Sequence, residues 1–172
     1  KILDNLESER KNIITKLGEN IQIRRYQMFH TNKMFITGYT HNNKIGAVVA
    51  LEKEDDNLSK DICMQVVASN PIALDEKSIN PSILLSEKEV YKAELDKIDK
   101  KEDIKRNILE GKIKKFISDN TLINQPYIKD NTTTLKKILK NNEIKTYIRY
   151  QLGEGIDKKE EDFAQEVYSQ IK

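Results

Sequence analysis

The sequence contains little of what disulfides, membrane spans and charge-driven interactions require. Its 172 residues include one cysteine, three prolines, six glycines and no tryptophan. The single cysteine, Cys63, excludes an internal disulfide and fits a reducing compartment. The longest apolar run, at residues 45–51, is far too short to cross a bilayer, and no basic-then-apolar leader opens the sequence. We therefore expect a cytoplasmic protein without a membrane partner.

The charges are numerous but balanced. There are 30 basic and 28 acidic residues, which leave a net charge of +2. No overall field therefore draws the chain to nucleic acid or to anionic lipid. The hydrophobic residues, 37% of the chain, recur with helix and strand periods, which indicates a packed α+β domain rather than disorder. Because the sequence begins at Lys1 inside an expected helix, we expect a fragment or a partly ordered chain.

Three stretches in the first third of the chain have strand patterns. Residues 21–28 alternate polar with apolar side chains, residues 34–39 follow a short polar turn, and residues 44–51 are nearly all apolar. A nearly continuous apolar strand is typical of the centre of a sheet that is covered on both faces. The short turns predict an antiparallel meander.

A last strand is predicted over residues 144–152. Its alternation places the apolar side chains on one face, and the other face would lie against water or a partner sheet. That second face carries Lys145, Tyr147, Arg149 and Gln151. The chain should therefore contain a small antiparallel sheet of three to four strands.

Helical periods predict two covering helices before the middle of the chain. The first spans residues 2–17 and stops at Gly18. The second begins at Asn57 as N-cap and ends before Pro71. Its broad apolar stripe consists of Leu58, Ile62, Cys63, Val66 and Val67.

Further helices are predicted beyond Pro71. Residues 86–116 form two charged arms around a tip at residues 99–103, which predicts a projecting helical hairpin that is coiled-coil-like. A short helix follows around Leu135 to Leu139, and an amphipathic helix with Phe163 ends the chain. We expect four segments: the first part of the core at 1–81, the inserted hairpin at 82–120, the second part of the core at 121–156 and a C-terminal module at 157–172.

Catalytic motifs find little support. The Gly-Glu-Gly at residues 153–155 lacks the third glycine of a dinucleotide loop and places a carboxylate where phosphate would bind, so a turn is favoured. Cys63 on an apolar helix stripe is favoured as a core residue over a nucleophile. His30 and His41 lie in separate stretches, and no metal-binding spacing occurs.

Six strings resemble, in order and with plausible spacing, signature segments of one protein family. KLGENIQIRR resembles the IGENINIRR signature of the elongation factor Ts family, and EGKIKKF resembles its EGRxKKF segment. The strings lie at residues 16–25, 39–46, 64–71, 110–116, 124–127 and 153–167. The resemblance covers nearly the whole chain. It implies an exchange factor for the GTPase elongation factor Tu.

The resemblance also implies which part of the family is present. The sequence resembles the second core subdomain, its inserted hairpin and the C-terminal module, whereas the amino-terminal module and the Thr-Asp-Phe-Val motif do not occur in these residues. In the family, the Asp-Phe pair of that motif intrudes near the magnesium site of the GTPase and helps to expel GDP. The chain is therefore expected to be a translation factor rather than an enzyme, without cofactor or metal, that binds elongation factor Tu but releases GDP poorly.

The resemblance assigns six residues to contact with elongation factor Tu: Leu17, Gly18, His41, Ile128, Lys129 and Phe163. Lys129 departs from the family, in which that position is often apolar. From the residues alone, Leu17 fits a core leucine at a helix end, His41 is an exposed turn residue, and Ile128 either caps the core or stands exposed.

Two other hypotheses concern self-association and RNA. In some family members the sheet of this half carries a homodimer, so a structural module is a second possibility. The second hairpin arm is locally basic, which permits an RNA-binding hairpin, although a solvated helix face is favoured and no specific nucleic acid is expected. The basic residues are Lys105, Arg106, Lys112, Lys114 and Lys115.

Overall fold

The computed structural model describes residues 2–29 and 33–155, and its contacts divide the chain into two units, Lys1–Asn32 and Lys33–Lys172. In the first unit, helix α1 (Ile2–Leu17) ends at Gly18, which has a φ of +72° and whose N–H donates to the Ile14 carbonyl at 2.8 Å. The predicted helix and its glycine stop are therefore confirmed.

The segment after α1 is not a strand. Arg10 of α1 binds the Glu7 carboxylate and also donates to the Ile21 carbonyl at 2.8 Å, which ties this segment back to the helix. The strand predicted over residues 21–28 is wrong. Its alternating pattern is present, but a strand also needs a neighbouring strand to satisfy its backbone groups, and residues 19–29 pair with none among the described residues.

The second unit contains a three-stranded antiparallel sheet in the order β1-β2-β5, which confirms the α+β class. The strands are β1 (Phe35–His41), β2 (Ile45–Leu51) and β5 (Ile144–Gln151). Strand β2 is central, as predicted, but its second neighbour is β5 from far along the chain instead of a third strand of a meander. The second edge strand of the sheet therefore comes from the part of the chain that follows the helical hairpin.

The turn between β1 and β2 depends on two asparagines. Asn42 and Asn43 have φ values of +49° and +54°, in the left-handed region that asparagine tolerates better than most residues. The N–H of Lys44 donates to the His41 carbonyl at 3.0 Å and closes the turn.

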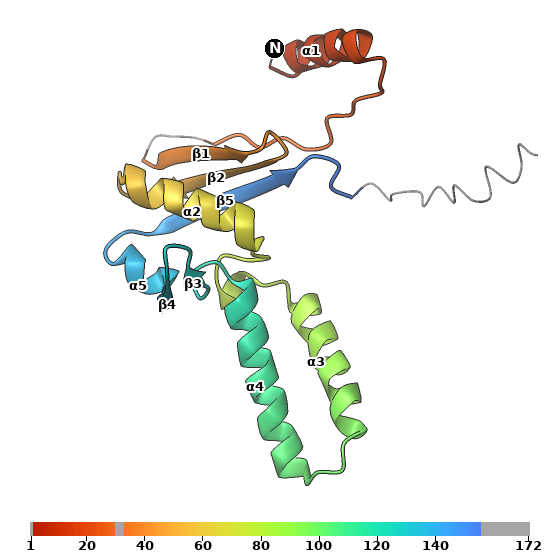
Figure 1. Cartoon of the computed structure of the whole chain (residues 1–172), viewed down its shortest axis with the longest axis vertical. Coiled ribbons are helices and arrows are strands. Elements are labelled where there is room, and N and C mark those ends of the chain that lie inside the picture. The colour runs from red at the N-terminus through yellow and green to blue at the C-terminus, as the bar shows by residue number, and fades with distance from the viewer. Residues whose placement is uncertain (1, 30–32, 156–172) are drawn as a thin grey trace, which may run out of the picture. The chain divides into compact units, whose positions relative to one another are not determined.

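Helix α2 (Asp56–Ser69) packs on one face of the sheet (Figure 1). Its N-cap is Asp55, whose carboxylate accepts the N–H of Leu58 at 3.0 Å, so the expected cap at Asn57 is wrong. The predicted apolar stripe is confirmed as the helix side of the core. The core cluster consists of Ala47, Val49, Leu51, Leu58, Ile62, Cys63, Val66, Val67, Leu122, Leu135, Leu139 and Ile144.

The predicted sidedness of β5 is wrong. Leu51 pairs with Ile144 but Ala50 pairs with Thr146, so Lys145 is an extra residue that shifts the alternation by one position. Tyr147 therefore lies on the same side as Ile144, facing α2. Its hydroxyl donates to the Pro71 carbonyl at 2.8 Å.

Arg149 lies on that same face, and its Nε donates to the carbonyl of Val67 at 3.4 Å. The face that carries Tyr147 and Arg149 is consequently covered by α2 and not by a partner sheet, and both residues are half-buried.

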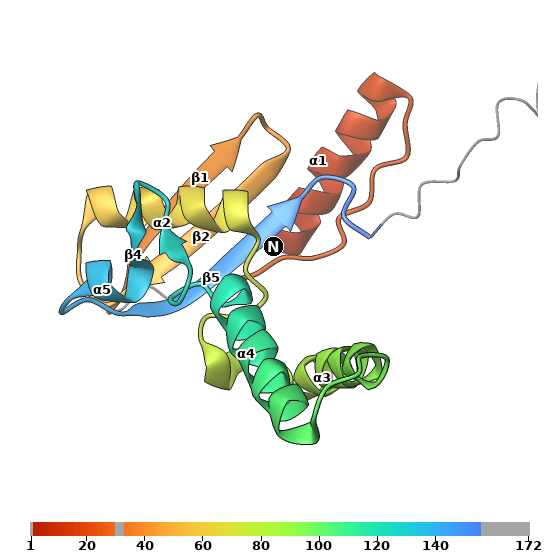
Figure 2. The ribbon, with the colours of Figure 1, turned by 60° about the horizontal axis from the view of Figure 1, so that its bottom comes forward.

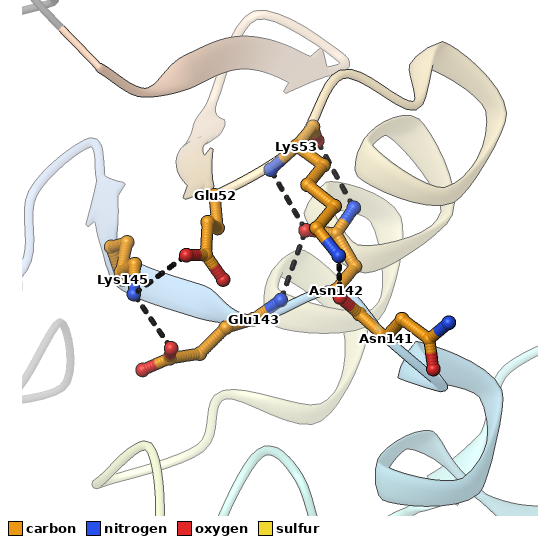
Figure 3. A network of polar contacts seen from close by, with 6 residues as sticks. All are labelled: Glu52, Lys53, Asn141, Asn142, Glu143 and Lys145. Atoms are coloured by element: carbon orange, nitrogen blue, oxygen red, sulfur yellow. Dashed lines mark hydrogen bonds and ion pairs between the residues drawn. The ribbon is translucent and has the colours of Figure 1, made fainter.

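A polar network fixes the start of β5 next to the end of β2 (Figure 3). Asn142 accepts the Lys53 N–H and donates to the Lys53 carbonyl, both at 3.0 Å. Lys145 lies between Glu143, at 2.6 Å, and Glu52, at 3.8 Å. These contacts pin the register at which the extra residue is accommodated.

After a 3-10 turn (Glu76–Ser78), helices α3 (Pro81–Asp96) and α4 (Glu102–Asn120) form the predicted hairpin (Figures 1 and 2). Leu95 is the one buried residue of the two helices. The apolar residues Val90, Ile98 and Ile104 are exposed.

Between the hairpin and β5 the chain forms two very short strands, β3 (Pro126–Tyr127) and β4 (Asp130–Thr134), followed by α5 (Leu135–Leu139). The predicted short helix is confirmed. The C-terminal helix predicted around Phe163 lies outside the described residues. Across residues 2–29 and 33–155, no helix combines the length and the apolar character that a membrane crossing requires.

Candidate partner-binding surface

The end of α1 presents Leu17 to solvent. Its side chain is 62% exposed, which rules out the alternative of a core leucine within the described structure. Gly18 follows in a left-handed conformation, and nothing lies within 4 Å of a Cβ built there. Glycine is therefore required by the backbone and not by crowding. The side chain of Leu17 is therefore accessible at the helix end.

His41 is exposed, as predicted, at the end of β1. The Asn42 amide nitrogen lies 3.2 Å from Nε2, and the Tyr39 hydroxyl lies 3.2 Å from Nδ1. In the neutral ring, Nε2 accepts from Asn42 and Nδ1 donates to Tyr39. The imidazole is thus oriented by its neighbours, and the residue stays exposed.

Ile128 stands in the tight turn between β3 and β4, with 44% of the residue exposed. Of the two alternatives left open by the sequence, the exposed one is confirmed. An exposed apolar side chain gains free energy when a partner removes it from water, so Ile128 is available as a contact.

Lys129, beside Ile128, is tethered to the protein. Its Nζ lies 2.7 Å from the Asp61 carboxylate on α2, although 59% of the lysine side chain is exposed. The Tyr127 hydroxyl donates to the other oxygen of the same carboxylate. Burial, and after it the hydrogen bond to Asp61, raises the pKa of Tyr127 to about 12. One buried carboxylate therefore binds both side chains that flank Ile128.

Gln65, four residues after Asp61 on α2, binds the backbone of the same turn. Its Nε2 donates to the Pro126 carbonyl at 3.2 Å, and its Oε1 accepts the Ile128 N–H at 3.3 Å. Gln125 extends the network, since its Oε1 accepts from Ser69 at 2.6 Å. We define the segment at residues 126–129 as the clamped turn.

The sequence did not single out Asp61 or Gln65. A signal was present in their spacing, because residues four apart lie on the same face of a helix. Both are polar residues within a helix whose stripe is otherwise apolar, and both are buried. What they bind could not be inferred, since the turn they hold has no strand pattern of its own.

The structure brings together only some of the six predicted residues. Ile128 and Lys129 are neighbours on the clamped turn. His41 is the last residue of β1 and pairs with Ile45 at one end of the sheet. The clamped turn lies toward the other end, because α5, which contacts β3 and β4, leads into the first residue of β5 there (Figures 1 and 2). Leu17 and Gly18 belong to the first unit, and Phe163 lies outside the described residues.

The cations of the hairpin are largely engaged with carboxylates of the same hairpin. Lys105 pairs with Glu102 and Lys115 with Asp119, at 3.3 and 2.7 Å. Arg106 pairs with Asp103, and Lys112 pairs with Glu94 while lying over the ring of Tyr91. Such mutual pairing is typical of a solvated helix face and leaves little net field for RNA.

The two residues considered for chemistry have structural surroundings. Cys63 is buried, and its thiol donates to the Thr37 carbonyl at 3.3 Å. Burial raises the pKa of this thiol to about 11, so it stays protonated at neutral pH and is a poor nucleophile. Gly153, with a φ of +74°, ends β5 in a turn, as expected for the Gly-Glu-Gly segment.

Comparison with known proteins finds similarity to one protein family. The family model described as Elongation factor TS matches residues 3–154. A protein named Elongation factor Ts from Vesicomyosocius okutanii subsp. Calyptogena okutanii (strain HA) is 41% identical over 170 residues, which are 98% of this chain and 59% of that protein.

Two further relatives carry the same name. The protein from Ruthia magnifica subsp. Calyptogena magnifica is 40% identical over 98% of this chain and 57% of its own length. The protein from Francisella tularensis subsp. novicida (strain U112) is 39% identical over 96% of this chain and 57% of its own length. The chain therefore spans less than two thirds of the length of these curated relatives.

Proposed function

The chain belongs to the elongation factor Ts family, and from this membership we propose that it binds the GTPase elongation factor Tu and takes part in the release of GDP from it. Such a factor performs no covalent chemistry. It binds the nucleotide-free GTPase more tightly than the GDP-bound form. By linkage, the factor and GDP then weaken each other's binding by the same ratio.

The observation that carries the proposal is the exposure of Ile128 on the clamped turn. A partner-binding residue should be apolar, accessible and held in place, and Ile128 meets all three conditions. Leu17 adds a second exposed apolar side chain at a position that the family resemblance assigns to the partner. Lys129 keeps its charge toward Asp61, so its departure from the family pattern does not place an unpaired charge beside Ile128.

We further propose that these 172 residues bind elongation factor Tu but release GDP slowly. The sequence contains no Thr-Asp-Phe-Val, which is the motif that the family uses near the magnesium site. Recognition and expulsion of the nucleotide would then be carried by different parts of the factor. The division predicts a chain that competes for the GTPase without exchanging its nucleotide efficiently.

The test is a titration of elongation factor Tu loaded with fluorescent GDP, in which complex formation and GDP release are followed in the same sample. Complex formation with little acceleration of release supports both parts of the proposal. Fast release would show that these residues disturb the nucleotide site by themselves, and the proposed division would be wrong. An absence of complex would overturn the binding proposal itself.

Matched variants locate the surface. Ile128→Ser should weaken binding about tenfold or more, which corresponds to at least 1.4 kcal/mol for one buried anchor. Val90→Ser is the control, because Val90 is a similarly exposed branched residue on the hairpin. It should bind as the unsubstituted chain does. Equal losses for both variants would indicate a general effect of surface hydrophobicity.

A homodimer is a second candidate, favoured by the sheet face opposite α2. Val48 and Ile148 are direct cross-strand neighbours on this face, and Ile36 and Tyr150 also lie on it. A second copy of the chain could pack against these side chains. Sedimentation at several concentrations tests this: association that Ile148→Lys abolishes supports the dimer, and a monomer at all concentrations removes it.

A further inference from the structure

We propose that Asp61 and Gln65 are positioning residues for the contact with elongation factor Tu, because from α2 they hold the clamped turn in the shape that presents Ile128. The inference rests on the proposed function. It goes beyond it by assigning a role in recognition to two buried side chains that the partner does not touch.

Gln65 holds the turn through both ends of its amide. It is 2% exposed, and its nitrogen and oxygen bind the Pro126 carbonyl and the Ile128 N–H, respectively. One side chain therefore fixes the backbone on either side of Tyr127. A carboxylate at this position could not donate to Pro126, and an aliphatic side chain could neither donate nor accept.

Asp61 holds the side chains of the turn. It is 5% exposed and accepts from the Tyr127 hydroxyl with one oxygen, while the other lies 2.7 Å from Lys129 Nζ. A buried carboxylate is costly unless its charge is compensated and its lone pairs are bound. Tyr127 and Lys129 provide both, and in doing so they are held on either side of Ile128.

The turn needs this support because its own ladder is weak. Strand β3 has two residues, its register shifts between Pro126 and Tyr127, and proline has no N–H to contribute. So short an antiparallel pair is not stable alone in water. The clamped turn therefore takes its conformation from α2.

Helix α2 is a suitable platform because its two faces have different partners. Ile62 and Val66, one residue beyond Asp61 and Gln65, are fully buried in the core. The apolar face anchors the helix on the sheet, and the polar face holds the clamped turn. Ile128 is thus connected to the sheet through one rigid element, which lowers the ordering cost of binding.

The decisive variant is Gln65→Leu, tested in a double-mutant cycle with Ile128→Ser. We expect Gln65→Leu to weaken binding of elongation factor Tu about tenfold, because one or two interface residues of the turn would then have to be ordered when the complex forms. In the Ile128→Ser background the same substitution should change the affinity less than about twofold, since there is no anchor left to present.

The control is Val66→Ala, on the same helix. It removes core volume and lowers thermal stability without touching the clamped turn, so the folded protein should bind with unchanged affinity. A merely structural role for Gln65 would make Gln65→Leu resemble this control. Affinity that Gln65→Leu leaves unchanged, or reduces equally with and without Ile128, overturns the inference.

A second variant and a partner-free measurement keep the test decisive if Gln65→Leu folds poorly. Asp61→Asn retains an acceptor for Tyr127 but no longer pairs with Lys129, and it should weaken binding about threefold, again only when Ile128 is present. Hydrogen exchange of the Ile128 amide should be faster in Gln65→Leu than in Val66→Ala.

The two proposals fail differently. If the unsubstituted chain does not bind elongation factor Tu, the proposed function falls and the inference falls with it. If it binds but Gln65→Leu and Asp61→Asn bind equally well, only the inference is overturned. If it binds but Ile128→Ser has no effect, the inference falls together with the placement of the binding surface at Ile128, while the proposal that the chain binds elongation factor Tu stands.

Discussion

The sheet with α2 and the α3–α4 hairpin belong to the same unit but are stabilised differently. The sheet layer buries a continuous apolar cluster from β2, α2 and β5, joined by Leu122, Leu135 and Leu139. The hairpin, described over its whole length, buries Leu95 alone. Its remaining contacts are a narrow half-buried seam and ion pairs in contact with solvent.

The difference shows where free energy of unfolding resides. Buried apolar surface stabilises the folded state roughly in proportion to its area. An exposed ion pair stabilises it little, because water solvates both charges well. The sheet layer should therefore determine global stability, and the hairpin should open locally at lower cost. This arrangement also places the clamped turn on the stable region, through α2, and leaves the hairpin free to vary.

The largest expected effect is in the sheet layer. Ile62→Ala should lower the free energy of unfolding by about 3 kcal/mol, because it leaves a cavity in the fully buried cluster. Urea denaturation followed by circular dichroism measures this. A loss below about 1 kcal/mol would mean that the cluster collapses around the cavity, and the contrast with the hairpin would be lost.

Leu95→Ala is the corresponding change in the hairpin. We expect a loss of about 2 kcal/mol that is confined to α3 and α4, since the two helices have few other apolar contacts. Hydrogen exchange resolved by residue is the measurement. Faster exchange in the hairpin with unchanged exchange in β2 fits the comparison. Equal acceleration in β2 would show that the hairpin and the sheet unfold as one.

The regions also differ in how far their sequences determine them. The 3.6-residue period predicted α2, its stripe and both hairpin arms, because each helix satisfies its own backbone. Strand predictions succeeded for β1 and β2 but failed at residues 21–28, where no partner strand is available. The prediction of which β5 side chains share a face failed for another reason. One extra residue, Lys145, shifts the alternation. The polar network that accommodates this residue joins segments far apart in sequence.

The candidate surface was predictable only in outline. Family resemblance suggested Leu17, His41 and Ile128 as contact residues, and the structure shows that all three are exposed. The supports of Ile128 could not be predicted, because Asp61 and Gln65 precede the turn they hold by about sixty residues. Neither a period nor a motif connects positions at that separation; only tertiary contacts do.

Alkaline pH should affect the sheet layer through Tyr147. Burial raises the pKa of this phenol to about 12, above the value of about 10 that is usual for tyrosine. The unfolded chain therefore loses the proton first, so the stabilisation is fully present below pH 10 and is lost as the pH rises toward 12. Tyr147→Phe should cost about 1 kcal/mol at neutral pH by removing the bond to Pro71, and it should flatten the decline in stability above pH 10.

Denaturation at several pH values checks this prediction, with Tyr150→Phe, at an exposed position of the same strand, as the control. A decline that is equally steep in Tyr147→Phe would assign the alkaline sensitivity to other groups. Tyr127, whose pKa is also raised to about 12, is the next to test.

The smallest expected effect concerns the helix start in the hairpin. Asp55 caps α2, whereas Lys101 at the start of α4 makes no capping bond, although its φ of −60° and ψ of 146° suit an N-cap. Lys101→Ser should stabilise α4 by about 0.5 kcal/mol, because a hydroxyl can accept an unpaired N–H of the first turn. Serine is preferable to aspartate, since Glu102 and Asp103 follow directly.

Slower hydrogen exchange in the first turn of α4 is the expected result of Lys101→Ser. Because the hairpin opens locally, urea denaturation of the sheet should not change, and a parallel gain there would contradict the independence of the two regions.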